Sequence, residues 1–228
     1  MDSVTQNKLL TKHFSQFISK HKMDFIERVL DHRTRHVTIV LEDIYQSQNA
    51  SAVVRTCECL GLQDLHIIET TSTWTTNKLV LKGSNKWLDI IRYKKKGGHN
   101  IEDCFHLLRQ KGYRIAVTDP SPDGVSLEDV PIDRPLAIVM GNERHGSSPY
   151  ALAHADSKIH IPMVGFTESL NISVSAAICL NSILSRLRNS SLRWQLTDEE
   201  KELLRLQWYK GVVRRSELLE REFLRTIE

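Results

Sequence analysis

The sequence predicts an α/β domain built on a mostly parallel β-sheet with helices on both faces. Short runs rich in Val, Ile and Leu recur along the chain, and stretches with helix-like spacing of apolar residues separate them. Runs of four to six mostly apolar residues between helices are typical of parallel strands, since these are covered on both faces and need not alternate with polar residues.

Six segments are the expected strands: VTIVL (37–41), LHII (65–68), WLDII (87–91), RIAVT (114–118), LAIVM (136–140) and KIHI (158–161). Helices are expected near 50–60, 101–111 and 148–155, and over a longer stretch from about 171 to 188. The α/β domain is therefore expected to span residues 36–190. Ligands of open α/β sheets bind beyond the carboxyl ends of strands, so the ends of the last three strands and the turn-rich loop DPSPDG (119–124) are the first candidates for a site.

Both ends of the chain are predicted to be helical extensions, at residues 1–35 and 191–228. Apolar residues between positions 5 and 30 have a helix-like, though irregular, spacing. Thr197 and Glu200 have the spacing of a capping box at the start of a further helix. Gly211 is expected to interrupt that helix, and another helical stretch follows Ser216.

Composition favours a cytoplasmic protein that is not associated with a membrane. Of the 228 residues, 40% are hydrophobic and 26% charged, and no apolar run approaches the length of a membrane span. The N-terminus lacks the apolar core of a secretory signal. The four cysteines show no metal-binding spacing, so buried, reduced thiols and no metal site are expected.

The net charge of +3 is weak evidence for a polyanionic partner, but the basic residues are clustered. Such clusters suit contacts to phosphates, although solvated surface charge is an equally good interpretation of each cluster alone. The candidate phosphate contacts are Arg33, Arg35, Arg186 and Arg188.

The loop after the first strand and the absence of several motifs exclude common nucleotide and metal sites. VTIVL is followed by EDIYQSQNAS, which has no glycine, so backbone could not approach a dinucleotide as in an ordinary dehydrogenase. The phosphate-binding GxxxxGK[ST] and the zinc-binding HExxH are absent as well.

Three other segments combine polar side chains with strand ends. In QSQNASAVVRTCECLG (46–61), Asn49 is expected to cap a helix, and Arg55 follows six residues later. An arginine in a small, apolar helix needs an anionic partner, which could be a carboxylate of the protein or a phosphate of a ligand. In VMGNERHGSS (139–148), Gly141 and Gly146 bracket Glu143, so backbone there can approach a ligand.

The third segment is IPMVGFTESLNISVSAAICL (161–180). Ser169 or Asn171 could cap the helix that comes next, or could contact a ligand, and the residues alone leave both interpretations open. The small side chains at the start of that helix allow close packing of a ligand, another chain segment or a second subunit.

In this order and spacing, the three segments resemble the SpoU class of the SPOUT methyltransferases. The first family motif is an Asn followed by Arg, Thr and a distal Leu-Gly; the second is Met-Gly-x-Glu-x-x-Gly; the third is Ile-Pro-Met followed by Ser-Leu-Asn-x-Ser-x-Ala. The matching residues are Asn49, Arg55, Thr56, Leu60, Gly61, Met140, Gly141, Glu143, Gly146, Ile161, Pro162, Met163, Ser169, Leu170, Asn171 and Ser173. Position 175 is serine where alanine is usual, and Ser47 and Gln48 stand where proline and histidine are common.

The resemblance covers residues 36–188 and implies a trefoil knot at the C-terminal end of the sheet and a homodimer, neither of which follows from periodicity. The helical ends make the layout most similar to the TrmH subfamily of tRNA (guanosine-2'-O)-methyltransferases. This implies transfer of a methyl group from S-adenosyl-L-methionine to a ribose of tRNA, with the D-loop guanosine at position 18 as the expected target and S-adenosyl-L-homocysteine as the product. Alternatives are another tRNA position, ribosomal RNA, a SPOUT enzyme that methylates a base nitrogen, and a catalytically silent RNA-binding protein.

The resemblance also implies roles for individual residues. The expected catalytic residues are Arg55, Asn49, Glu143, Ser169 and Asn171. The expected cofactor-binding residues are Thr118, Met140, Gly141, Ile161, Met163, Ser169 and Leu170. Arg55 is expected to activate the ribose hydroxyl; because a guanidinium stays protonated, it needs a phosphate or carboxylate relay or acts by positioning. The active site is expected to combine Arg55 of one subunit with the cofactor bound to the other subunit.

Overall fold

The computed structural model describes residues 3–121 and 124–227, so Pro122 and Asp123 of the DPSPDG loop lie outside the described residues. The chain divides into two compact units. One comprises the residues from Thr34 to Trp194, and the other combines the residues up to Arg33 with those from Gln195 onward. The two helical ends, expected as separate extensions, thus belong to one unit.

The unit from Thr34 to Trp194 is built on a sheet whose described strands all pair in parallel, in the order β3-β2-β1-β6-β4-β7-β5. The strands are β1 (Val37–Glu42), β2 (Asp64–Ile68), β3 (Asp89–Tyr93), β4 (Arg114–Thr118), β5 (Val125–Ser126), β6 (Leu136–Met140) and β7 (Ser157–His160). The order is not that of the sequence, since β6 lies between β1 and β4. The parallel sheet predicted from the apolar runs is confirmed.

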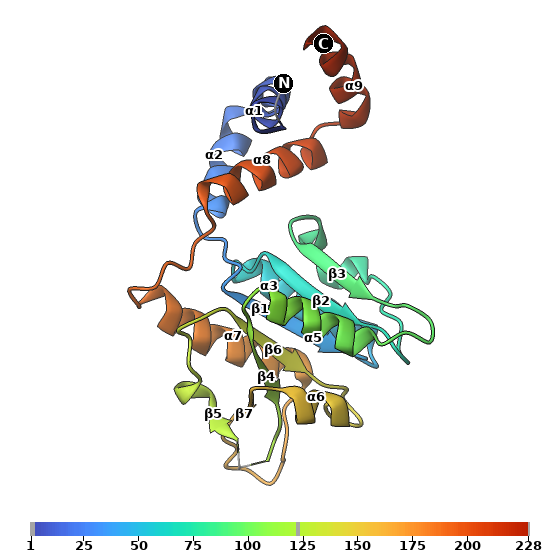
Figure 1. Cartoon of the computed structure of the whole chain (residues 1–228), viewed down its shortest axis with the longest axis vertical. Coiled ribbons are helices and arrows are strands. Elements are labelled where there is room, and N and C mark those ends of the chain that lie inside the picture. The colour runs from blue at the N-terminus through green and yellow to red at the C-terminus, as the bar shows by residue number, and fades with distance from the viewer. Residues whose placement is uncertain (1–2, 122–123, 228) are drawn as a thin grey trace. The chain divides into compact units, whose positions relative to one another are not determined.

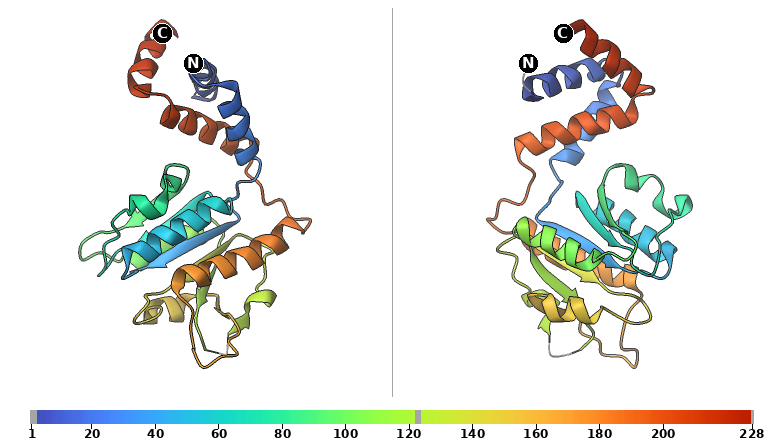
Figure 2. Two further views of the ribbon diagram at one scale, coloured as in Figure 1. Left: turned by 180° about the vertical axis from the view of Figure 1, so that it is seen from behind. Right: turned by 45° about the vertical axis from the view of Figure 1, so that its right-hand side comes forward.

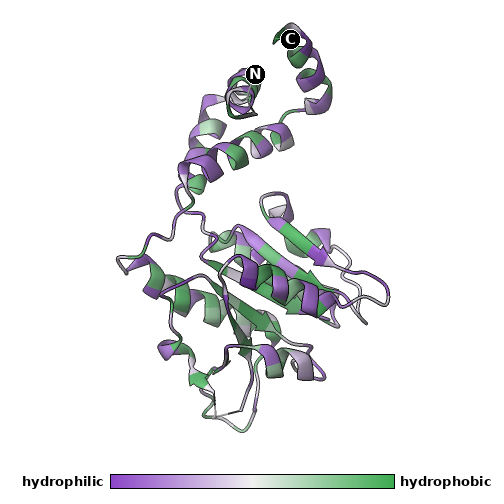
Figure 3. Cartoon of the chain, viewed as in Figure 1, coloured by the Kyte–Doolittle hydropathy of each residue, from purple (hydrophilic) through white to green (hydrophobic). Residues whose placement is uncertain are grey.

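Helices cover both faces of this sheet (Figures 1 and 2). The helices of the unit are α3 (Ser47–Cys59), α4 (Lys78–Leu81), α5 (Asn100–Gln110), α6 (Pro149–His154) and α7 (Ile172–Arg188), with 3-10 turns η1 (Ser84–Lys86) and η2 (Leu127–Asp129). The first apolar cluster joins the sheet to α3 and α7, and the second joins it to α5 and α6. Every residue of β6 is buried, as expected for a central strand with helices on both sides, and Figure 3 shows hydrophobic colour along β6 and β4.

The second unit consists of four helices, α1 (Ser3–Ser15), α2 (Lys20–Leu30), α8 (Asp198–Val212) and α9 (Ser216–Ile227), in the part of the chain that is described. Its buried residues include Phe14 and Trp208, and Arg205 makes a bidentate ion pair with Glu27 at 2.6 and 2.7 Å. The capping box of Thr197 and Glu200 is confirmed.

Four local expectations differ from the structure. Strand β3 begins at Asp89 and not at Trp87, because Trp87 closes the η1 turn through a hydrogen bond to Ser84. Helix α8 continues through Gly211, and the chain turns at Arg215, which has φ +56°. Cys59 is exposed, whereas the other three cysteines are buried.

The fourth difference concerns Asn49, which does not cap α3. The helix begins earlier, with Gln46 at the N-cap position and no side-chain capping bond. The side chain of Asn49 instead makes hydrogen bonds to residues outside the helix.

None of the described helices combines the length and the apolar character that a membrane span requires.

Candidate active site

A cavity of about 520 Å³ lies where β4, β6 and β7 end, at the carboxyl edge of the sheet. This is the edge at which parallel sheets bind ligands, and the volume suits a small organic molecule. The connection from β7 to α7, drawn below the sheet in Figure 1, supplies one side of the cavity. All seven expected cofactor-binding residues line it: Thr118, Met140, Gly141, Ile161, Met163, Ser169 and Leu170.

Glu143 joins two loops at the mouth of this cavity. Its carboxylate accepts hydrogen bonds from the backbone N–H of Tyr45 at 2.7 Å and of Gln46 at 3.3 Å, and from the side-chain amide of Asn49 at 2.9 Å. Partial burial raises the pKa of Glu143, but these hydrogen bonds outweigh it and hold the pKa below its ordinary value. Glu143 is therefore an ionised anchor for the loop between β1 and α3.

The network continues from Asn49 to the start of α7. The Oδ1 atom of Asn49 accepts a hydrogen bond from the amide of Asn171 at 3.2 Å. Asn171 is the N-cap of α7, and its own oxygen accepts from the backbone N–H of Ser173 at 2.9 Å. Asn49, Glu143 and Asn171, from the three motif segments, thus meet at one point.

The loop that carries Glu143 is a tight turn. Asn142 and Gly146 exchange two backbone hydrogen bonds of 2.8 Å, and Gly146 has φ +68°. A Cβ on Gly141 would stand 2.3 Å from the backbone nitrogen of Ser147, so only glycine fits where the turn folds back.

Asp43 organises the site, although no sequence motif pointed to it. It has φ +48°, and its carboxylate accepts three backbone hydrogen bonds, from Thr70, Thr71 and Ser72, at 2.6–3.2 Å. Its carbonyl accepts from the side chain of Asn142 at 2.5 Å. The loops after β1, β2 and β6 are thereby tied together. Since the partners of Asp43 are mostly backbone groups, no pattern of side chains could indicate them.

Arg55 does not reach the cavity of its own chain. It is exposed on α3 and donates a hydrogen bond to the carbonyl of Val80 at 3.4 Å. Arg55 follows Asn49 by six positions in the helix. It therefore lies about 9 Å farther along the helix axis and points about 120° away from the direction of Asn49. Of the expected catalytic residues, the other four line the cavity.

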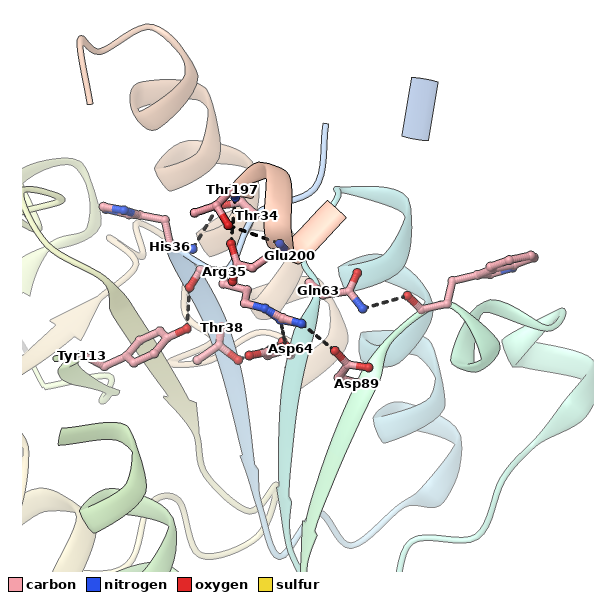
Figure 4. A network of polar contacts seen from close by, with 11 residues as sticks. Thr34, Arg35, His36, Thr38, Gln63, Asp64, Asp89, Tyr113, Thr197 and Glu200 are labelled. Carbon is pink, nitrogen blue, oxygen red and sulfur yellow. Dashed lines mark hydrogen bonds and ion pairs between the residues drawn. The ribbon is translucent and has the colours of Figure 1, made fainter. Parts of the chain in front are cut away.

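The four arginines expected to contact RNA are all engaged within the protein. Arg35 bridges Asp64 and Asp89, at 2.8 Å each, and these carboxylates are aligned at the amino ends of β2 and β3 (Figure 4). The carbonyl of Arg35 also accepts a hydrogen bond from the hydroxyl of Tyr113. Arg35 therefore stabilises the edge of the sheet opposite the cavity.

The other three arginines also make contacts within the protein. Arg33 is fully buried, with its guanidinium 5.3 Å from the ring centre of Trp208. Arg186 donates to the carbonyls of Val130 and Leu127 and so fastens η2 to α7. Arg188 donates to the carbonyl of Leu60 at 2.6 Å.

The comparison with protein families agrees with this geometry. A model described as the SpoU rRNA Methylase family matches residues 36–181, which include all three segments that meet at the cavity. The chain belongs to the SpoU methylase family. Membership implies the α/β knot fold expected from the resemblance, trefoil knot included.

Relatives within the SpoU family extend beyond the matched domain. The chain is 44% identical over 206 residues to a tRNA (guanosine(18)-2'-O)-methyltransferase of Borreliella burgdorferi, covering 90% of this chain and 92% of that protein. A crystal structure of the TrmH/SpoU tRNA modifying enzyme of A. aeolicus has a TM-score of 0.75 and 27% identity, over 86% of this chain and 98% of that one.

A more distant SpoU structure is that of the methyltransferase AviRb from Streptomyces viridochromogenes, in complex with the cofactor AdoMet. It has a TM-score of 0.55 and 19% identity, and the match covers 72% of this chain and 62% of that one. At this identity the likeness is one of fold.

Proposed function

We propose that this SpoU family member transfers a methyl group from S-adenosyl-L-methionine to the ribose 2'-hydroxyl of guanosine 18 in tRNA. The observation that carries the proposal is the 44% identity to a tRNA (guanosine(18)-2'-O)-methyltransferase over nine-tenths of the chain, helical ends included. The meeting of Asn49, Glu143 and Asn171 at one cavity supports it. This substrate implies a cytoplasmic protein.

The cavity residues fit this cofactor. Leu127, Met140 and Ile161 offer apolar contacts to an adenine ring, and the polar residues Thr118 and Ser169 also line the cavity. The Nδ1 atom of His160, which also lines the cavity, is buried without a hydrogen-bond partner in the described part of the chain, and a polar ligand would supply one. S-adenosylmethionine supplies an electrophilic methyl group when bound.

The roles of the protein groups follow from their positions. Residues 161–171 would hold the cofactor, with Ser169 and Leu170 in its pocket and Asn171 fixing the start of α7. Asn49 would orient the ribose, because its amide lies at the cavity mouth and is held from two sides. Glu143 would position Asn49 without taking a proton itself.

Arg55 would position the ribose hydroxyl, and it would do so in the site of the partner subunit, because it faces away from the cavity of its own chain. The exposed apolar residues of one helix and its preceding loop support such a dimer. Large apolar side chains are exposed on α7 and on the loop before it: Val164, Phe166, Leu170, Val174 and Ile178. Exposed apolar side chains that gather into a contiguous patch mark protein interfaces, so we expect these residues to be covered in the dimer.

The test is incubation of the full chain with S-adenosylmethionine and an unmodified tRNA transcript, followed by mass-spectrometric mapping of methylated riboses. A single 2'-O-methylguanosine at position 18 is the expected product. Transfer to ribosomal RNA or to another tRNA position would reject the substrate proposed here. Binding of tRNA without binding of S-adenosylmethionine and without methyl transfer would indicate the catalytically silent RNA-binding protein.

A further inference from the structure

An exposed arginine is stacked on an exposed tyrosine beside the cavity mouth. The guanidinium of Arg144 lies 3.6 Å from the ring centre of Tyr45. Tyr45 is 51% exposed, and Arg144 is exposed as well. Neither the sequence motifs nor the roles proposed above account for this pair.

Both residues are held by the network that builds the site. The backbone N–H of Tyr45 donates to Glu143 at 2.7 Å, and that of Arg144 donates to the side chain of Asn142 at 2.8 Å. Each stands next in the chain to a residue that lines the cavity, Gln46 and Glu143 respectively. The stack is therefore fixed at the rim, where ordering it on binding costs little.

The charge of Arg144 is not neutralised within the described residues, because none of their carboxylates pairs with it there. Its planar guanidinium has the tyrosine ring on one face. A planar cation in that position suits stacking on a nucleobase, and arginine planes serve this purpose in RNA recognition.

We propose that Tyr45 and Arg144 form a stacking platform for the base of the nucleotide whose ribose is methylated, so that base, guanidinium and phenol ring stack in that order. The proposal rests on the proposed function. A ribose held by Asn49 at the cavity mouth would direct its base outward to the rim. Tyr45 and Arg144 stand at that rim, next to the cavity residues Gln46 and Glu143, and offer a planar surface to the base.

The test compares variants of the full chain in binding to unmodified tRNA and in methyl transfer. Arg144→Ala should raise the KM and Kd for tRNA about tenfold, which is within the range that one base–aromatic stack contributes. Arg144→Lys should bind tRNA nearly as weakly as Arg144→Ala, because lysine keeps the positive charge but lacks the planar guanidinium. Tyr45→Ala should follow Arg144→Ala, and Tyr45→Phe should behave as wild type.

Arg134→Ala is the matched control. Arg134 is an exposed arginine just before β6, at the amino edge of the sheet, and its removal should leave the tRNA affinity unchanged. Titration of S-adenosylmethionine by calorimetry should give wild-type affinity for every variant, which verifies that the cavity is intact.

A transcript that lacks the base at position 18 identifies the stacked base. If the platform holds that base, Arg144→Ala and the abasic substitution remove the same contact, so their penalties do not add. Additive penalties would overturn the proposal. So would wild-type affinity in Arg144→Lys combined with weak binding in Arg144→Ala, since that result indicates a phosphate contact. A wild-type chain that does not methylate tRNA refutes the proposed function itself, whereas an active wild type with an unaffected Arg144→Ala refutes only the platform.

Discussion

Gly141→Ala tests whether the cavity depends on the tight turn that carries Glu143. The added Cβ would stand 2.3 Å from the nitrogen of Ser147 and 2.4 Å from the carbonyl carbon of Gly146. Side-chain Cβ atoms stay beyond 3.0 Å of such atoms, so the turn must open by about 0.7 Å. All the nearby atoms are backbone, and no flexible side chain can yield instead.

The expected cost combines two terms. Overpacking a closely fitted site costs about 1–3 kcal/mol. Opening the turn also weakens the pair of backbone hydrogen bonds between Asn142 and Gly146, which contribute about 1 kcal/mol each. We expect Gly141→Ala to lower the free energy of unfolding by about 2–4 kcal/mol. Cofactor affinity should fall as well, because Gly141 lines the cavity.

Urea unfolding and calorimetric titration of S-adenosylmethionine measure both effects, and two glycines provide graded controls. Gly146→Ala places a Cβ in open space but at φ +68°, so a loss of about 1–2 kcal/mol is expected. Gly165→Ala meets nothing within 4 Å and should change the free energy of unfolding by less than about 0.5 kcal/mol. A Gly141→Ala variant as stable and as tight for the cofactor as Gly165→Ala would refute the reasoning.

Three further predictions concern charged groups. Arg55→Ala should abolish methyl transfer and leave calorimetric cofactor affinity unchanged, since Arg55 does not line the cavity; loss of cofactor binding would contradict its role. Glu143→Gln should lower the free energy of unfolding at pH 7 by about 1 kcal/mol, because an amide cannot accept all three hydrogen bonds. The pKa of Glu143 is lowered in the folded state, although burial alone would raise it. The difference in unfolding free energy between wild type and Glu143→Gln should therefore disappear as the pH falls through that pKa. A difference that persists in acid would reject the ionic contribution. Burial lowers the pKa of His66 to about 4, so below pH 6.5 the unfolded chain binds more protons than the folded one. The free energy of unfolding should therefore fall by a few kcal/mol between pH 6.5 and 4. A His66→Gln variant with the same pH slope in urea unfolding would contradict this role of His66.

The apolar runs were sufficient to predict the parallel α/β class of the fold, because burial dictates where such runs occur. Strands β4 and β6 lie where their apolar runs begin and end, since β6 is buried along its whole length and β4 at its three central residues. Strand β5 was missed because two residues carry no periodicity. The start of β3 was misplaced because Trp87 and Leu88 are apolar for another reason, the packing of the η1 turn and the core.

The sequence predicted some residues of the candidate site and missed others. Side chains in the motifs, such as Asn49 and Glu143, were found through the family resemblance. Asp43 was not, because it acts on backbone groups. The basic clusters did not indicate the protein partners of Arg35 and Arg186. These partners are far away in the sequence, and a one-dimensional pattern does not distinguish an arginine held by the fold from one that faces solvent.

The contacts that bring Asn49, Glu143 and Asn171 together connect residues 94 and 122 positions apart. A chain still emerging from the ribosome cannot assemble this junction until α7 has been synthesised, however early the first strands pair. Contacts of such long sequence separation form slowly. Cofactor binding would therefore be among the last properties that a newly made chain acquires, and its onset would report completion of the fold.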